Sequence, residues 1–197
     1  MLRNVTARVI QIIILVFIIL LAGCNQQEIE TNMSETMEDF KATTQDGEPL
    51  TSNDLAGEWW IANFMYTNCT MVCPTMTPNL ISVQNDLDSS NLDAQIISFS
   101  IDPEYDSPDV LKDYAEEYQI DLSNWNFLTG YDFESIQDLS ENSFKTVLED
   151  GGPEGHEFVH STYVFLINPE GEVVKQYDGI SENELQTLVD DLEIVLD

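Results

Sequence analysis

The sequence predicts an α/β domain with a central mixed sheet flanked by helices. Segments patterned like β-strands alternate along the chain with segments patterned like helices, and this alternation is typical of α/β domains. One segment, 59–65, is apolar almost throughout, as expected for a central strand that is buried on both faces. The chain closes with a predicted hairpin and a helix, so antiparallel strands should join the parallel ones.

The N-terminal segment 1–23 has the features of a secretory signal peptide. Two arginines give it a positive start, residues 9–21 are almost wholly apolar, and small residues precede Cys24. A stop-transfer helix is the alternative, but the apolar run is shorter than the roughly 20 residues that span a bilayer. The sequence Leu-Ala-Gly-Cys resembles the lipobox of bacterial lipoproteins, which implies cleavage before Cys24 and lipid attachment to its sulfur.

The segment 24–38 is polar and acidic and has no apolar periodicity, so we interpret it as a flexible, lipid-anchored tether. The remaining residues, 39–197, suffice for one domain with a substantial core. A lipid on Cys24 would hold this domain on the outer face of the bacterial cell membrane.

The chain is strongly acidic, with 37 Asp and Glu residues against six Lys and Arg and a formal net charge of −31. Nucleic-acid binding is excluded as a function class, because phosphate contacts need Lys and Arg. The acidic residues could form a solubility surface, or they could attract metal cations or basic partners. The acidic residues are spread evenly along the chain, which favours a solubility surface. We expect the chain to be a monomer.

A β-hairpin should open the domain, since residues 40–44 and 49–50 flank an Asp-Gly turn signal. After the buried strand 59–65, a helix should run from Pro74 to Leu87. Its apolar residues recur at three- and four-residue steps: Met76, Leu80, Val83 and Leu87.

The second half of the domain continues the alternation. We expect strands at 94–101, 125–129, 162–167 and 172–177. We expect helices from Ser107 to Tyr118, from Asp132 to Ser143, and after Ser181. Ser and Asp at these starts are good N-caps, and a proline after Ser107 suits the first helical position. The turn Asn168-Pro169-Glu170-Gly171 should join the last two strands into a hairpin.

Cys69 and Cys73 lie where the buried strand ends and the next helix begins. Residues four apart share one face of a helical turn, with Cβ atoms roughly 5–6 Å apart. This separation permits a disulfide or the binding of one soft metal ion by two thiolates, and a nearby helix N-terminus favours thiolate. Burial as small hydrophobic residues, or a purely structural disulfide, is the plainer alternative.

The cysteine pair lies at the carboxyl end of a central strand, where ligands bind in open α/β sheets. Together with the order of the elements, this position resembles the thioredoxin fold. If Cys24 carries lipid, Cys69 and Cys73 form an isolated pair outside the cytoplasm, where thiols need a reason to stay reduced.

The chain has two histidines, His156 and His160, in a segment rich in glycine. In a thioredoxin-like fold the strand after His160 runs beside the cysteine strand, so we expect His160 near the cysteines. A histidine before a strand is more often a surface or hydrogen-bonded residue, but a dithiol outside the cytoplasm favours a ligand. We interpret His156 as a solvated loop residue, with an accessory ligand as the alternative.

Three motifs together resemble the Sco/SenC family, whose members assemble the copper centre of cytochrome c oxidase. They are Phe64-Met65-Tyr66-Thr67-Asn68-Cys69 through Cys73-Pro74-Thr75-Met76-Thr77, Ser100-Ile101-Asp102-Pro103 with the residues to Pro108, and His160-Ser161-Thr162-Tyr163 through Gly171. The resemblance covers most of the mature domain and implies copper bound by Cys69, Cys73 and His160. The residue types agree, because thiolates select Cu(I) and imidazole supports Cu(I) and Cu(II) alike.

Asp102 ends a predicted strand that neighbours the cysteine strand. It could orient a copper ligand or approach the metal from outside the ligand set. It could equally be the turn residue that an Asp-Pro pair indicates. The sequence leaves both interpretations open.

The resemblance implies a membrane-tethered chaperone that delivers copper to the copper-A centre on cytochrome c oxidase subunit II. The alternative is a thiol–disulfide oxidoreductase that reduces the cysteines of that subunit, with Cys69 and Cys73 as its redox-active pair. Thioredoxin-like reductases carry Cys-x-x-Cys and a cis-proline before the facing strand, and this chain has Cys-x-x-x-Cys and Ser161-Thr162 instead. We therefore expect a metallochaperone rather than an enzyme. A peroxidase is disfavoured, since no arginine follows the signal segment.

Overall fold

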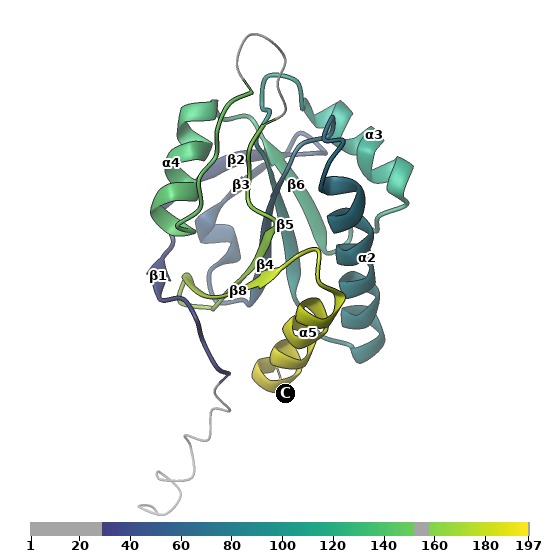
Figure 1. Cartoon of the computed structure of the whole chain (residues 1–197), viewed down its shortest axis with the longest axis vertical. Helices are drawn as coiled ribbons and strands as arrows, with labels where there is room; N and C mark the ends of the chain where they lie inside the picture. The colour runs from purple at the N-terminus through teal and green to yellow at the C-terminus, as the bar shows by residue number, and fades with distance from the viewer. Residues whose placement is uncertain (1–28, 152–157, 197) are drawn as a thin grey trace, which may run out of the picture.

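The computed structural model describes residues 29–151 and 158–196 (Figure 1). Its strands are β1 (Glu35–Thr36), β2 (Lys41–Thr44), β3 (Pro49–Thr51), β4 (Trp60–Met65), β5 (Gln95–Ser100), β6 (Trp125–Thr129), β7 (Tyr163–Ile167) and β8 (Glu172–Asp178). Its helices are the 3-10 helix η1 (Ser52–Leu55), α2 (Cys73–Ser90), α3 (Pro108–Tyr118), α4 (Phe133–Ser143) and α5 (Glu182–Leu196). The predicted strands and helices are therefore confirmed, with boundaries that shift by a few residues.

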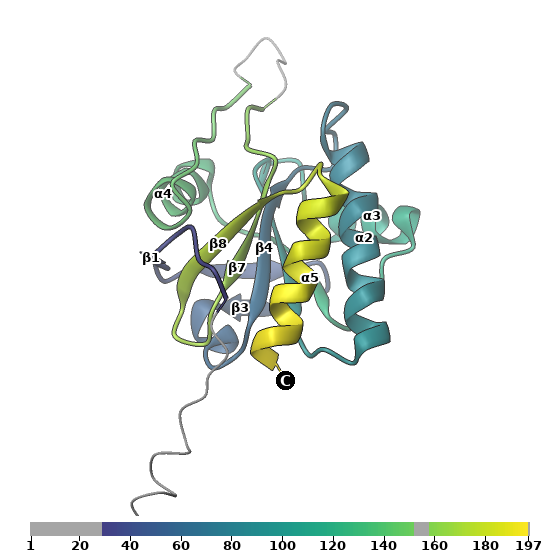
Figure 2. The same cartoon turned by 60° about the horizontal axis from the view of Figure 1, so that its bottom comes forward.

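The strands form one mixed sheet in the order β1-β8-β7-β4-β5-β6-β2-β3. The central strand β4 pairs in parallel with β5 and antiparallel with β7, so Trp60 lies opposite Gln95 on one side and Ile167 on the other. Helices α2, α3 and α5 cover one face of the sheet and α4 covers the other (Figures 1 and 2). The predicted hairpin is β2–β3, which extends the sheet beyond β6.

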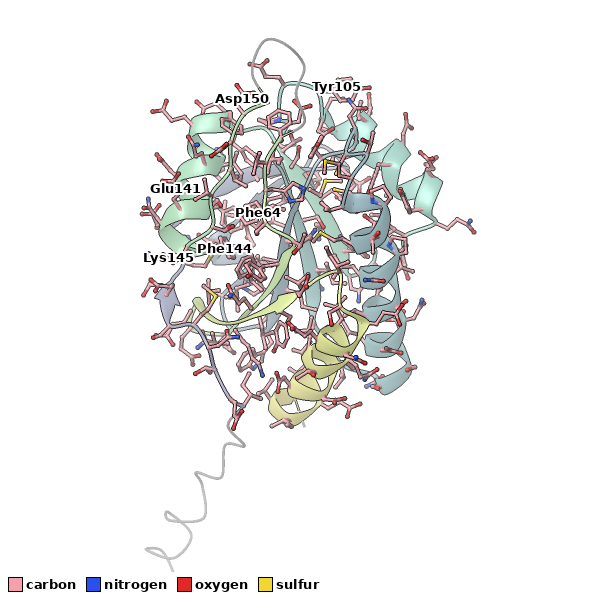
Figure 3. The ribbon with its side chains drawn as sticks, viewed as in Figure 1. Phe64, Tyr105, Glu141, Phe144, Lys145 and Asp150 are labelled. Carbon is pink, nitrogen blue, oxygen red and sulfur yellow. The ribbon has the colours of Figure 1, made fainter. Side chains whose placement is uncertain are left out.

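The core is built on β4, whose six residues are all buried. Between the sheet and α4, Phe64 packs edge-on against Phe144 with ring centroids 5.2 Å apart, and Phe144 lies 4.8 Å from Phe165 (Figure 3). Fully burying one such side chain contributes roughly 1.5–3 kcal/mol. Burial on both faces explains why this strand is apolar almost throughout, and it fixes the point at which the cysteine loop leaves the sheet.

The N-terminal segment differs from the prediction of a flexible tether over 24–38. Within it, β1 pairs with the edge strand β8, and the Met33 N–H donates to the Val174 carbonyl at 3.0 Å. Lys145 also contacts the Glu35 carboxylate, 3.1 Å away. An edge strand offers unpaired backbone groups that any sequence can use, and the partly buried side chains of Met33 and Met37 pack against the core.

Cys24 and the predicted signal segment lie outside the described residues. Within the described ranges, no helix combines the length and the apolar character that crossing a membrane requires.

The three predicted N-caps are present, and the Ser181 hydroxyl accepts a hydrogen bond from the Glu184 N–H at the start of α5. The Ser107 hydroxyl accepts a hydrogen bond from the Val110 N–H, and the Asp132 carboxylate accepts one from the Ser135 N–H at 2.9 Å. Helix α2 is different, because its N-cap residue Val72 has no side-chain acceptor. The first N–H groups of α2 therefore need another partner, and the cysteine loop supplies one.

Candidate metal centre

Cys69 lies on the loop that joins β4 to α2. The Cys69 N–H donates to the Tyr66 carbonyl at 3.2 Å, which folds the loop back toward the helix. The Cys73 N–H then donates to the Cys69 sulfur at 3.4 Å, so this sulfur takes the place of a capping oxygen at the start of α2. Both cysteines are buried, and neither forms a disulfide.

The pKa values of the two thiols are shifted in opposite directions. The hydrogen bond from the Cys73 thiol lowers the pKa of Cys69 most, and His160 and backbone N–H groups lower it further. The same hydrogen bond raises the pKa of Cys73, and burial raises it again. The hydrogen bond between them therefore favours the thiolate on Cys69 and the proton on Cys73.

His160 completes the group. The ligand atoms of Cys69, Cys73 and His160 all lie within 4.8 Å of one another, and Cys73 Sγ lies 4.0 Å from His160 Nε2. His160 Nδ1 lies 2.8 Å from the Ser161 carbonyl oxygen, which only accepts hydrogen bonds, so Nδ1 carries the proton. Nε2 lies on the side of the sulfurs, where it can bind a metal ion that replaces its hydrogen-bond partners.

Aromatic contacts hold the segment that carries His160. The centroid of the Phe158 ring lies 5.2 Å from that of Tyr66 and 5.8 Å from that of Phe133, and the Tyr66 and His160 rings are nearly perpendicular with centroids 5.9 Å apart. Val159 forms a backbone bridge to Glu149, with both hydrogen bonds near 3 Å. The contacts of Phe158 and Val159 thus fix the backbone directly before His160. His156 lies outside the described residues.

Asp102 acts as a turn residue. Its carbonyl accepts the N–H groups of Tyr105 and Asp106, and its own N–H donates to the Ser100 hydroxyl. Among the described residues, the metal-ligand group contains Cys69, Cys73 and His160, and not the Asp102 carboxylate. These contacts support the turn interpretation, and a role beside the metal stays a prediction.

Asp106 is a site residue that the sequence did not indicate. Its carboxylate is fully buried and accepts hydrogen bonds from the Thr67 N–H at 3.2 Å, from the Thr67 hydroxyl, and from the Ser100 hydroxyl. It therefore ties the cysteine loop to the end of β5. Burial raises the pKa of Asp106, and its charge also raises the pKa of Cys73.

The SCO1/SenC family model matches residues 28–196. The chain belongs to the SCO1/SenC family. It is 37% identical over 179 residues to the SCO1 protein homolog of Bacillus subtilis (strain 168), covering 90% of this chain and 91% of the relative. The family resemblance that the three motifs indicated is thus confirmed.

Solved structures confirm the thioredoxin-like Sco fold. A SCO1/SenC family lipoprotein from Bacillus anthracis str. Ames has a TM-score of 0.80 and 38% identity, covering 85% of this chain and 98% of that one. BsSco, described as a member of the Sco family of cytochrome c oxidase assembly proteins with a disulfide switch, has a TM-score of 0.77 and 36% identity, covering 85% and 96%. Yeast Sco1 with copper bound shares the fold at 24% identity, with a TM-score of 0.66 and coverage of 81% and 89%.

Replacing Asp106 with alanine should weaken copper binding about 10- to 100-fold, the usual effect of losing a group that orients metal ligands. The variant frees the Thr67 hydroxyl and N–H, so the cysteine loop loses its link to β5. Competition with a Cu(I) chelator of known affinity measures the change. Asp109→Ala on the exposed first turn of α3 is the matched control, and an Asp106→Ala affinity equal to that of the control would show that the loop needs no such link.

Proposed function

We propose that this chain is a copper chaperone for the assembly of cytochrome c oxidase. The observation that carries the proposal is the group of two cysteine sulfurs and one imidazole nitrogen, all within 4.8 Å of one another. Thiolates bind Cu(I) in preference to harder cations, and imidazole suits both copper oxidation states. BsSco, which is 36% identical, is described as belonging to a family of oxidase assembly proteins, and a yeast relative has been solved with copper bound.

The three residues have different tasks in taking up the metal. Cys69, whose pKa is lowered, is the first ligand. The Cys73 thiol gives up its proton as it binds, so uptake of one copper ion releases about one proton per protein. His160 binds through Nε2, because Nδ1 is held against the Ser161 carbonyl. Three protein ligands leave room on copper for an incoming ligand, so the recipient can replace them in turn through a shared-copper intermediate.

The recipient in this proposal is subunit II of cytochrome c oxidase, which carries the two-copper centre. We further propose that lipid on Cys24 anchors the chain to the outer face of the cell membrane and that the chain works as a monomer. The relative from Bacillus anthracis, described as a lipoprotein, supports the anchor.

A thiol–disulfide oxidoreductase is the second candidate, and the state of the cysteine pair favours it. Cys69 has a lowered pKa and accepts a hydrogen bond from Cys73, as an attacking thiolate and its resolving partner do. A disulfide between them would remove two of the three copper ligands. The chain can therefore hold copper or exchange disulfides, but not both at once.

A transfer experiment separates the two functions. The chain, reduced and loaded with one copper ion, is mixed with the copper-free, reduced copper-centre domain of subunit II from the same organism. We expect two copper ions to move to each domain, and the absorption bands of the mixed-valence copper-A centre to appear after one-electron oxidation with ferricyanide. In a parallel sample, the copper-free reduced chain meets the oxidised domain. Rapid appearance of thiols there, with no copper transfer in the first sample, would replace the chaperone with the reductase.

A further inference from the structure

Exposed apolar side chains surround the metal-ligand group. Met71 is 71% exposed, Tyr105 52% and Val159 54%, and they are three of the seven large apolar side chains that the described residues leave open to solvent. Single exposed apolar residues are ordinary on a protein surface. These three are notable for their positions, and we call them the apolar rim.

Each member of the apolar rim lies on a different segment of the site. Met71 lies between the two cysteines, and Val159 directly precedes His160. Tyr105 precedes Asp106, whose carboxylate is bonded to Thr67 on the cysteine loop. The contacts that assemble the ligands therefore also bring these exposed side chains to one end of the molecule. Figure 3 shows Tyr105 at this end, far from the C-terminal end of α5.

Carboxylates lie among the same segments. Glu104 and Asp150 both act on Asp102 by charge repulsion, which adds to burial in raising its pKa. We call these three residues the acidic rim, and Figure 3 places Asp150 at the same end as Tyr105.

The segments that carry the ligands, Asp102 and Glu104 contain no basic residue. Segments 66–73, 101–107 and 158–163 contain neither Lys nor Arg. Three of the lysines form ion pairs elsewhere: Lys112 with Asp46, Lys145 with Glu35, and Lys175 with Asp191. Asp102 and Glu104 therefore have no Lys or Arg within these segments.

We propose that the apolar rim and the acidic rim form a docking face for a copper-accepting protein domain whose own metal loop is surrounded by Lys or Arg and apolar side chains. The proposal rests on the function proposed above and names how the recipient is recognised. Cys69 is only 9% exposed and Cys73 3%, so a recipient reaches the sulfurs only by contacting the loops around them. Apolar contact at the centre of such a face stabilises the complex, and the carboxylates steer a basic partner toward it.

The test uses the whole chain in detergent and the reduced, copper-free copper-centre domain of subunit II from the same organism. One variant combines Met71→Ser, Tyr105→Ser and Val159→Ser, and another combines Glu104→Gln and Asp150→Asn. Two controls lie away from the docking face: Ile194→Ser on α5, and Glu141→Gln on α4, which Figure 3 labels. Each protein is first shown to bind one copper ion with unchanged affinity, which establishes that the site is intact.

We measure the second-order rate constant of copper transfer at low and high salt. Both docking-face variants should lower it about tenfold at low salt, and the charge variant should also lose most of the salt dependence. The two controls should transfer copper like the unmodified chain. Equal rate constants in all five proteins would overturn the docking face and leave the chaperone function standing.

Association of the copper-free proteins is measured by titration in the same buffers. Binding that the docking-face variants lose, without any copper transfer from the unmodified chain, would support the docking face and contradict the chaperone function. If the unmodified chain does not bind the domain and does not transfer copper to it, both the docking face and the chaperone function are overturned. Vesicle binding by the unmodified chain that the Met71→Ser, Tyr105→Ser and Val159→Ser variant loses, with equal binding of both to the copper-centre domain, would assign the exposed side chains to a membrane surface and overturn the proposal.

Discussion

Replacing Cys73 with serine is expected to abolish tight copper binding. A serine hydroxyl keeps its proton at neutral pH and is a hard oxygen donor, whereas Cu(I) selects thiolates. We expect the affinity for Cu(I) to fall by more than about 100-fold, since losing a group that merely orients a metal ligand already costs about 10- to 100-fold. Cys69→Ser should behave in the same way. Competition of the reduced variants with a Cu(I) chelator of known affinity measures the loss.

The loss should come from the missing sulfur and not from unfolding. Serine differs from cysteine by one atom, and Cys73 lies at the first turn of a long helix, so the copper-free variant should keep a cooperative thermal transition. Asn68→Ser changes an exposed residue of the same loop and is the matched control. If Cys73→Ser and Asn68→Ser bound Cu(I) equally well, the cysteine pair could not be the copper site.

Replacing His160 with alanine should give the second-largest effect, a weakening of copper binding of about 10- to 100-fold. Two thiolates remain, so binding should not vanish. The loss should be greater for Cu(II) than for Cu(I), because thiolates alone suit the reduced ion and imidazole supports the oxidised one. Titrations of the reduced variant with each copper oxidation state, under matched conditions, measure the two losses.

His156→Ala is the matched control, since it removes the only other histidine of the sequence. It should bind copper like the unmodified chain. An unchanged affinity in His160→Ala would leave the dithiol as the sole active element and favour the oxidoreductase. A loss as large in His156→Ala as in His160→Ala would instead give the copper site a second imidazole.

The strands and helices were predictable because their signals are local. Continuous apolar character marks β4, three- and four-residue steps mark α2, and caps mark α3 and α4. The strand β1 was missed for the opposite reason. It contains two residues and pairs with β8 through backbone groups, which leaves no side-chain pattern to read.

The sequence was sufficient to predict the three metal ligands, but not the buried carboxylate that holds the cysteine loop in place. The spacing of Cys69 and Cys73 is visible in the sequence, and the fold places His160 beside them. Asp106 has no such signal, because its burial depends on Thr67, 39 residues away, and on Ser100 in a neighbouring strand. In an acidic chain, one buried carboxylate looks like the many exposed ones.

The central claim is that Cys69, Cys73 and His160 hold one copper ion together. X-ray absorption at the copper edge tests this most directly, on the reduced chain loaded with one copper ion and on His160→Ala. We expect two sulfur scatterers and one imidazole around copper in the unmodified chain, and the same two sulfurs without the imidazole in the variant. A copper environment with fewer than two sulfurs, or with an imidazole that survives the substitution, would contradict the three-residue site.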